Sequence, residues 1–179
     1  MYSKGRTVLH NEMLPKFASF FKHGDTVVEV GKHVYWDYSS YFQNPVRMCE
    51  FISIDLQGGL KDQDTGEPLQ YWVDDITHSK FTDQSIDGVL FIGMHDNIGD
   101  PLLAYKEIYR ILKPGGRVLI AFPGSGAACG GRLVNQFDWT EYLTGFIIDS
   151  VEFVYDPENQ DRYGEGKNTS IQVIARKPL

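Results

Sequence analysis

Four residues able to bind or activate a ligand stand at or just after short apolar segments. They are Gly31, Asp55, Asp75 and His95. A glycine lets the backbone approach a ligand closely, and a carboxylate accepts hydrogen bonds from hydroxyl or amino groups. A histidine titrates near neutral pH and can take a proton from a reacting group. The four residues therefore predict a binding site with one candidate base.

The elements that must position these residues are short apolar runs that alternate with helical patterns. This alternation predicts a mostly parallel sheet with helices on both faces, an α/β fold. In such sheets ligands bind outside the carboxyl ends of the strands. The predicted strands are Thr26–Val30, Phe51–Ile54, Tyr71–Val73, Gly88–Ile92 and Arg117–Phe122.

Two longer segments have apolar residues at helical spacing. His10–Lys22 is predicted as a helix with Pro15 in its first turn, where the missing N–H costs little. Leu102–Leu112 is predicted as an amphipathic helix that ends before Pro114 and a glycine. Two short helices are also expected, over Tyr38–Phe42 and Asp138–Leu143.

The last third of the chain has a different pattern. Ile147–Tyr155 and Ser170–Arg176 are predicted as strands, and a charged loop, Asp156–Asn168, joins them. Two strands joined without a helix should pair antiparallel. We therefore expect the parallel sheet to close with an antiparallel strand at its C-terminal side.

Composition narrows the class of protein. A chain of 179 residues predicts a single domain, 1–179. Its net charge of -7 gives no field that attracts nucleic acid, so no nucleic-acid partner is expected. Cys49 and Cys129 form no CxxC motif, so neither a disulfide framework nor a metal site is expected, and a reducing cytoplasmic location fits. No signal-type core or membrane-spanning run is apparent, so no membrane association is expected.

The order of these pieces resembles the class I S-adenosylmethionine-dependent methyltransferases from about Asp25 to Arg176. The most specific phrase is Leu112-Lys113-Pro114-Gly115-Gly116, which leads from a helix into the fifth strand. The resemblance implies a Rossmann-like methyltransferase fold and transferase activity. It also implies S-adenosylmethionine as cofactor, S-adenosylhomocysteine as product, and a small molecule or metabolite as methyl acceptor.

The same resemblance assigns roles to individual residues. The acidic and glycine positions after the first strand would lie beside the methionine part of the cofactor, and Asp55 would bind the ribose hydroxyls. Asp75 and Ile76 would lie beside the adenine, and His95 would be the catalytic base in the acceptor pocket. Taken alone, Asp75 could instead cap a helix, and His95 could only shape the pocket. The implied cofactor-binding residues are Glu29, Gly31, Asp55, Leu56, Asp75, Ile76 and Gly93.

One segment departs from the family pattern. His33 and Tyr35 stand where the family has glycines, and Lys32 adds a charge that could attract the methionine carboxylate. The alternative is therefore a non-catalytic binding or partner protein with a degenerate cofactor loop, in a homo- or hetero-oligomer. A nicotinamide-dependent oxidoreductase is disfavoured, because this loop cannot form the glycine-rich pyrophosphate turn. A second glycine-rich stretch, Gly124–Gly131, is expected to be a mobile loop over the site.

Overall fold

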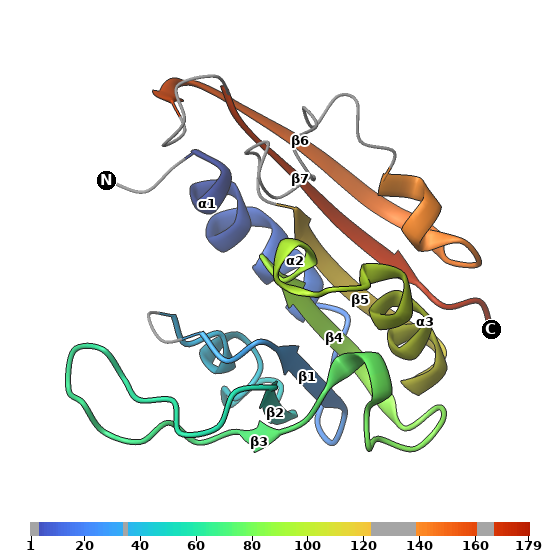
Figure 1. Cartoon of the computed structure of the whole chain (residues 1–179). Coiled ribbons are helices and arrows are strands. Elements are labelled where there is room, and N and C mark those ends of the chain that lie inside the picture. Colours follow the sequence, from blue (N-terminus) through green and yellow to red (C-terminus); the bar gives the residue numbers. More distant parts are fainter. Residues whose placement is uncertain (1–3, 34–35, 123–138, 161–166) are drawn as a thin grey trace.

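A computed structural model describes residues 4–33, 36–122, 139–160 and 167–179. Seven strands form one sheet in the order β3-β2-β1-β4-β5-β7-β6 (Figure 1). The strands are β1 Thr26–Val30, β2 Glu50–Asp55, β3 Trp72–Val73, β4 Ile86–Ile92, β5 Leu112–Phe122, β6 Ile147–Gln160 and β7 Lys167–Arg176.

The first five strands run parallel, and the last two close the sheet. β1 pairs parallel with β2 and β4, β3 with β2, and β5 with β4. β7 lies between β5 and β6 and is antiparallel to both. The carboxyl ends of β1 to β5 therefore share one edge of the sheet, which we call the carboxyl edge. The predicted α/β fold with an antiparallel C-terminal strand is confirmed.

Helices cover both faces of the sheet, as predicted. Helix α3 (Pro101–Ile111) packs with Tyr105 and Ile108 on one face, against Val28 of β1 among others. Helices α1 (Lys4–Val8) and α2 (Leu14–Ala18) cover the other face, where Phe17 packs in a cluster with Val27. Adjacent residues of a strand point to opposite faces, so β1 contributes to both apolar layers.

The N-terminal helix differs from its predicted bounds. It was predicted over His10–Lys22, but the helical run begins at Lys4 and ends at Ala18. Its middle is a π-helical turn, η1 (Leu9–Met13), in which the N–H of Leu14 donates to the carbonyl of Leu9. Proline removes one helical donor and its ring crowds the preceding turn. The wider π-turn just before Pro15 allows the helix to continue across that residue, so Pro15 stands inside the helical run rather than at its start.

The remaining short elements are tighter than predicted. The expected helices near Tyr38 and Leu143 are 3-10 turns, η2 (Ser39–Tyr41) and η6 (Trp139–Leu143). The antiparallel pair of C-terminal strands is confirmed and is longer than predicted. Trp72 lies on the short edge strand β3 and is 57% exposed. Gly124–Gly131 lies outside the described residues.

Within residues 4–33, 36–122, 139–160 and 167–179, no helix has the length and apolar character needed to cross a membrane. The same ranges hold no group of three or more histidine, cysteine, aspartate or glutamate side chains placed to bind a metal ion.

The packing of the N-terminal helix gives a first prediction. Phe17 is fully buried, and its ring makes edge contacts with Phe21 and Phe42 at centroid distances of 4.9 and 6.1 Å. Phe17→Ala should lower the free energy of unfolding by about 3–5 kcal/mol, measured by chemical denaturation. Phe20→Ala is the control: this ring is 39% exposed under the Arg117 guanidinium, and its loss should cost about 1 kcal/mol. Equal losses in the two variants would show that the helix does not pack as described.

Candidate functional site

A cavity of about 640 Å³ opens at the carboxyl edge of the sheet, and we call it the edge cavity. Its volume lies within the usual range for small-molecule sites. The ends of β1 and β2 and the segments after β3 and β4 contribute its walls. Five of the seven cofactor-binding residues predicted from the sequence line it: Gly31, Asp55, Leu56, Asp75 and Ile76.

Asp55 joins the loops that follow β1 and β2. Its Oδ2 accepts the backbone N–H of Lys32 at 2.9 Å, and its Oδ1 accepts the backbone N–H of Gln57 at 2.8 Å. Each carboxylate oxygen has a second lone pair. Asp55 can therefore fix both loops and still accept hydrogen bonds from a ligand in the edge cavity.

Gly31 has a conformation that requires glycine. Its φ is +81°, and its N–H donates to the carbonyl of Ile54 at 2.8 Å. A Cβ at this position would collide with the thioether of Met94. The bare backbone of Gly31 and the side chain of Met94 therefore form one wall of the edge cavity, at the end of β1.

Asp75 caps a turn and also lies in the wall of the edge cavity, so the two interpretations that the sequence left open do not exclude each other. Its Oδ1 accepts the N–H and the hydroxyl of Thr77, both at 2.8 Å, and so caps the 3-10 turn η3 (Ile76–His78). The bond from the Thr77 N–H is the main cause of a lowered pKa of Asp75, which keeps the carboxylate ionised. The residue caps a turn and also lines the edge cavity. Ile76 beside it is buried.

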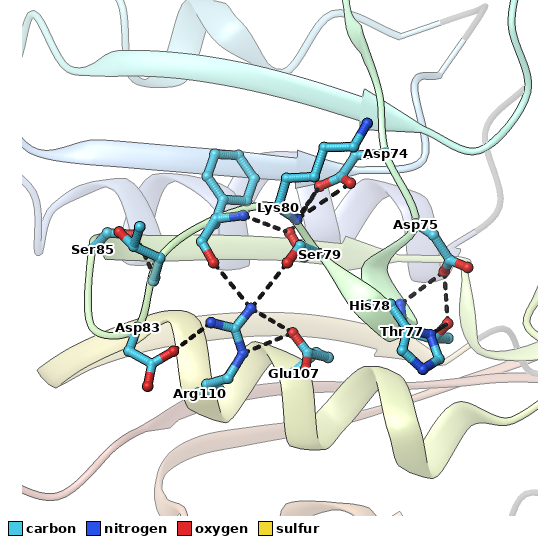
Figure 2. A network of polar contacts seen from close by, with 12 residues as sticks. Asp74, Asp75, Thr77, His78, Ser79, Lys80, Asp83, Ser85, Glu107 and Arg110 are labelled. Atoms are coloured by element: carbon cyan, nitrogen blue, oxygen red, sulfur yellow. Dashed lines mark hydrogen bonds and ion pairs between the residues drawn. The ribbon is translucent and has the colours of Figure 1, made fainter.

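A polar network fastens this segment to helix α3, as Figure 2 shows. Arg110 of α3 donates through Nη2 to the carbonyls of Ser79 and Phe81, at 3.1 and 3.0 Å. Its guanidinium also forms ion pairs with Asp83 at 2.5 Å and Glu107 at 2.7 Å. The buried Asp74 accepts the hydroxyl of Ser79 and the N–H of Lys80 within the same segment. Residues 74–83, which carry Asp75 and Ile76, are thus bonded to α3 through Arg110 and stabilised internally through Asp74.

Glu29 and Gly93 do not line the edge cavity. Glu29 is 1% exposed and points to the face opposite Val30, because adjacent residues of a strand alternate. Its Oε2 accepts the hydroxyl of Ser53 at 2.5 Å and the Lys32 ammonium at 3.4 Å, and burial raises its pKa. Its Oε1 is buried and accepts no hydrogen bond within the described chain. Gly93 ends β4 with a φ of +66°.

His95 lies at the carboxyl edge but is buried. Its side chain is 6% exposed, and Nδ1 lies 3.3 Å from the hydroxyl of Tyr105. The ring also packs against Tyr142 and Phe122, at centroid distances of 4.7 and 5.3 Å. It does not line the edge cavity. The role of a catalytic base therefore stays a prediction, and its expected pocket with the loop Gly124–Gly131 lies outside the described residues.

The substituted loop after Gly31 turns away from the edge cavity. Lys32 and His33 line a second cavity of about 510 Å³, together with Trp36 and Ser53. His33 therefore does not fill the space beside Gly31, as an occluding side chain would. Tyr35, the other substituted position, lies outside the described residues.

In the segment after β4, the sequence indicated Gly93 and His95 but not the neighbouring residues that line the edge cavity. Met94, Asn97 and Ile98 line the edge cavity, and Leu103 of α3 completes that wall. Their only signal was their position directly after a central strand, where ligands bind in sheets of this kind.

Comparison by sequence and by structure identifies the fold family. A family model described as "Methyltransferase domain" matches residues 38–120. A methyltransferase from Methanosarcina mazei, named as S-adenosylmethionine-dependent, superposes with a TM-score of 0.64 at 17% identity, over 92% of this chain and 98% of that one. The chain has the class I methyltransferase fold. The resemblance predicted from the sequence is confirmed.

Two further solved structures show the range of this fold. The cyclase SpnF superposes with a TM-score of 0.70 at 17% identity, over 98% of this chain and 81% of that one. Phosphoethanolamine N-methyltransferase 2 of Haemonchus contortus, in complex with S-adenosyl-L-methionine, superposes with a TM-score of 0.64 at 16% identity. The superposition covers 94% of this chain and 53% of that one. The comparisons support S-adenosylmethionine as the predicted cofactor. No curated protein matches the sequence significantly.

The network around Arg110 gives the second prediction. Arg110→Ala removes both bonds to the carbonyls of Ser79 and Phe81, which should cost about 1–3 kcal/mol of stability. Amides of residues 75–81 should exchange hydrogen faster, measured by mass spectrometry. Arg117→Ala is the matched control, because Arg117 of β5 also forms an ion pair, with Asp149 of β6, and its described hydrogen bonds and ion pair do not involve residues 74–83. Unchanged exchange in Arg110→Ala would show that the network does not hold this wall.

Proposed function

We propose that this chain binds S-adenosylmethionine in the edge cavity and transfers the methyl group to a small molecule. The observation that carries this proposal is the convergence of Gly31, Asp55, Asp75 and Ile76 on one cavity. These residues come from three separate segments, and the resemblance had assigned one segment to the methionine part, one to the ribose and one to the adenine of the cofactor.

The residues fit the cofactor in their chemistry. The bare backbone of Gly31 admits the methionine part, and Asp55 has free lone pairs for the ribose hydroxyls. Ile76 offers an apolar surface to the adenine, and Asp75 can accept its amino group. Glu29 does not line the edge cavity, and we keep it as a proposed cofactor contact only because its buried Oε1 can still accept a hydrogen bond. We assign Leu56 and Gly93 to the same site as flanking contacts.

In this reaction the protein positions the reacting groups and excludes water, and the cofactor supplies the reactive group. The cofactor, when bound, supplies an electrophilic methyl group on a sulfonium. The protein's task is to hold the acceptor in line with that group and to exclude water. Ile76, Ile98 and Leu103 give the edge cavity apolar walls for this purpose. An acceptor with an O–H group also needs a base, and we retain His95 for that role.

The alternative is a non-catalytic binding or partner protein with the same fold. The Met94 side chain lies over Gly31, and the loop after Gly31 lacks the further glycines. A cyclase shares the fold, so the fold does not by itself establish methyl transfer. Binding of S-adenosylhomocysteine without any transfer of a labelled methyl group would favour this alternative.

Other parts of the proposal rest on composition. The net charge of -7 favours a small-molecule acceptor over nucleic acid. The low cysteine content favours a cytoplasmic location. The small-molecule acceptor and the cytoplasmic location are both compatible with a partner subunit, either a second copy of this chain or another protein.

Asp55 provides the third prediction. Asp55→Asn removes one acceptor oxygen and should weaken S-adenosylhomocysteine binding by about 1–3 kcal/mol, measured by calorimetric titration. Asp25→Asn is the control: Asp25 makes the same kind of bond, to the N–H of Lys22, but lies before β1 at the opposite end of the strand. Equal affinity in Asp55→Asn and the unmodified protein would remove Asp55 from the site.

His95 provides the fourth prediction. If it is the base, His95→Gln should slow transfer of a labelled methyl group to pooled small metabolites by about 10²–10⁴-fold, with unchanged affinity for S-adenosylhomocysteine. The acidic limb of the pH–rate profile should disappear as well. Loss of thermal stability with an unchanged profile would assign His95 to packing against Tyr105 and Tyr142 instead.

A further inference from the structure

The side chain of Met94 lies directly against the backbone of Gly31, in the wall of the edge cavity at the end of β1. A Cβ built on Gly31 would lie 2.8 Å from the terminal methyl carbon of Met94 and closer still to its sulfur. Atoms in folded proteins do not approach a Cβ so closely, so the two residues leave no room between them for even a methyl group. The thioether of Met94 therefore fills the space beside Gly31.

The backbone that carries Met94 is held on both sides. The N–H of Gly93 donates to the carbonyl of Ala121 on β5 at 3.0 Å, and the side-chain amide of Asn97 donates to the carbonyl of Gly93 at 2.9 Å. The N–H of Asn97 donates to the carbonyl of Met94 at 3.0 Å. A methionine side chain has three rotatable bonds and no strong hydrogen-bonding group. Rotation of the Met94 side chain is therefore enough to open the space beside Gly31, and the backbone can stay in place.

The walls assigned to the nucleoside part of the cofactor have a different character. Asp55 and Asp75 keep acceptor lone pairs for hydroxyl and amino groups beyond the bonds that they already accept. Leu56, which is 70% exposed, and Ile76 add apolar surface. In the conformation described, the edge cavity thus offers contacts to a nucleoside, while the protein itself fills the place assigned to the methionine part.

Met94 and the tail of the cofactor have closely similar chemistry. S-adenosylhomocysteine carries two methylene groups beside its thioether sulfur, and so does a methionine side chain. The bare backbone of Gly31 can be contacted by one of the two groups at a time. Met94 is half-buried and packs against the apolar cluster of α3, which stabilises its position over Gly31.

We propose that Met94 determines the affinity of the edge cavity for the methionine part of the cofactor, by competing with it for the backbone of Gly31. This inference rests on the proposed binding of S-adenosylmethionine in that cavity. A ligand with the tail binds only those molecules in which Met94 has rotated away, so its apparent affinity is lowered by that fraction. A nucleoside without the tail binds in either position of Met94. The residue therefore favours nucleosides over the complete cofactor.

The test compares two ligands, S-adenosylhomocysteine and adenosine, by calorimetric titration of the full chain. The variants are Met94→Ala and Met94→Val; the second keeps an apolar group on Cβ but lacks the sulfur and the terminal methyl group. Met48→Ala is the control, because Met48 is 57% exposed and does not line the edge cavity. Thermal melting shows whether each variant is folded.

The proposal expects S-adenosylhomocysteine to bind about fivefold tighter or more in both Met94 variants. Affinity for adenosine should stay within about twofold, and Met48→Ala should change neither ligand.

A second measurement follows the Met94 methyl group directly by nuclear magnetic resonance. The chain has four methionines, so the Met94 signal of protein labelled at the methionine methyl groups is assigned by its loss in Met94→Ala. The contact with Gly31 predicts a nuclear Overhauser effect between this methyl group and the Hα of Gly31. The effect should persist with adenosine and disappear with S-adenosylhomocysteine.

Three outcomes would overturn the inference and leave the proposed function in place. They are unchanged or weaker binding of S-adenosylhomocysteine in both Met94 variants, an equal gain for both ligands, and a nuclear Overhauser effect that persists when S-adenosylhomocysteine is bound. Absence of S-adenosylhomocysteine binding in the unmodified protein and in every folded variant would refute the proposed function, and this inference with it.

Discussion

Two backbone N–H groups converge on the carboxylate of Asp55, and the shape of the carboxyl edge depends on this contact. The loops after β1 and β2 meet there through Lys32 and Gln57. In the described chain between β1 and β2, the only helical element is the 3-10 turn Ser39–Tyr41. No long helix holds these loops, so the hydrogen bonds to Asp55 and the bond from Gly31 to Ile54 fix them in place. An ionised acceptor forms strong bonds of this kind.

The two sides of the edge are held by different means. On the β3 side, one guanidinium, that of Arg110, ties the segment with Asp75 to α3 through carbonyls and carboxylates. On the β5 side, the N-terminal helix is packed by aromatic rings and bonded through Gly5 to β7. The first anchor is polar and specific in direction, and the second is mostly apolar. Between them, the Met94 side chain packs on the bare backbone of Gly31 and must move before a ligand can occupy that space.

Much of the cofactor side could be predicted from the sequence, because it depends on local rules. A residue at the end of a parallel strand must lie at the carboxyl edge, and this rule alone brings Gly31, Asp55 and Ile76 together. The same rule placed His95 at the edge but could not foresee its burial. The ring of Tyr142, which packs against it together with that of Tyr105, comes from an element distant in sequence.

Other features depend on backbone geometry that the pattern of residue types in the sequence does not predict. The helical run includes a π-turn before Pro15 and begins at Lys4, so that the carbonyl of Gly5 accepts a hydrogen bond from Gln172 of β7. Glu29 has the residue type expected beside a cofactor, yet strand alternation turns it to the opposite face from the edge cavity. The wall formed by Met94 has no sequence signature, because a methionine after a strand is ordinary core material.

The central claim is that one cavity, at the ends of β1, β2 and β3, receives the cofactor. Crystals grown with S-adenosylhomocysteine test it most directly. The account predicts electron density in the edge cavity, with the ribose hydroxyls on the Asp55 carboxylate, the adenine against Ile76, and the Met94 side chain moved off Gly31. Density for the ligand at another place, or an empty edge cavity in crystals of a protein that binds S-adenosylhomocysteine in solution, would contradict it.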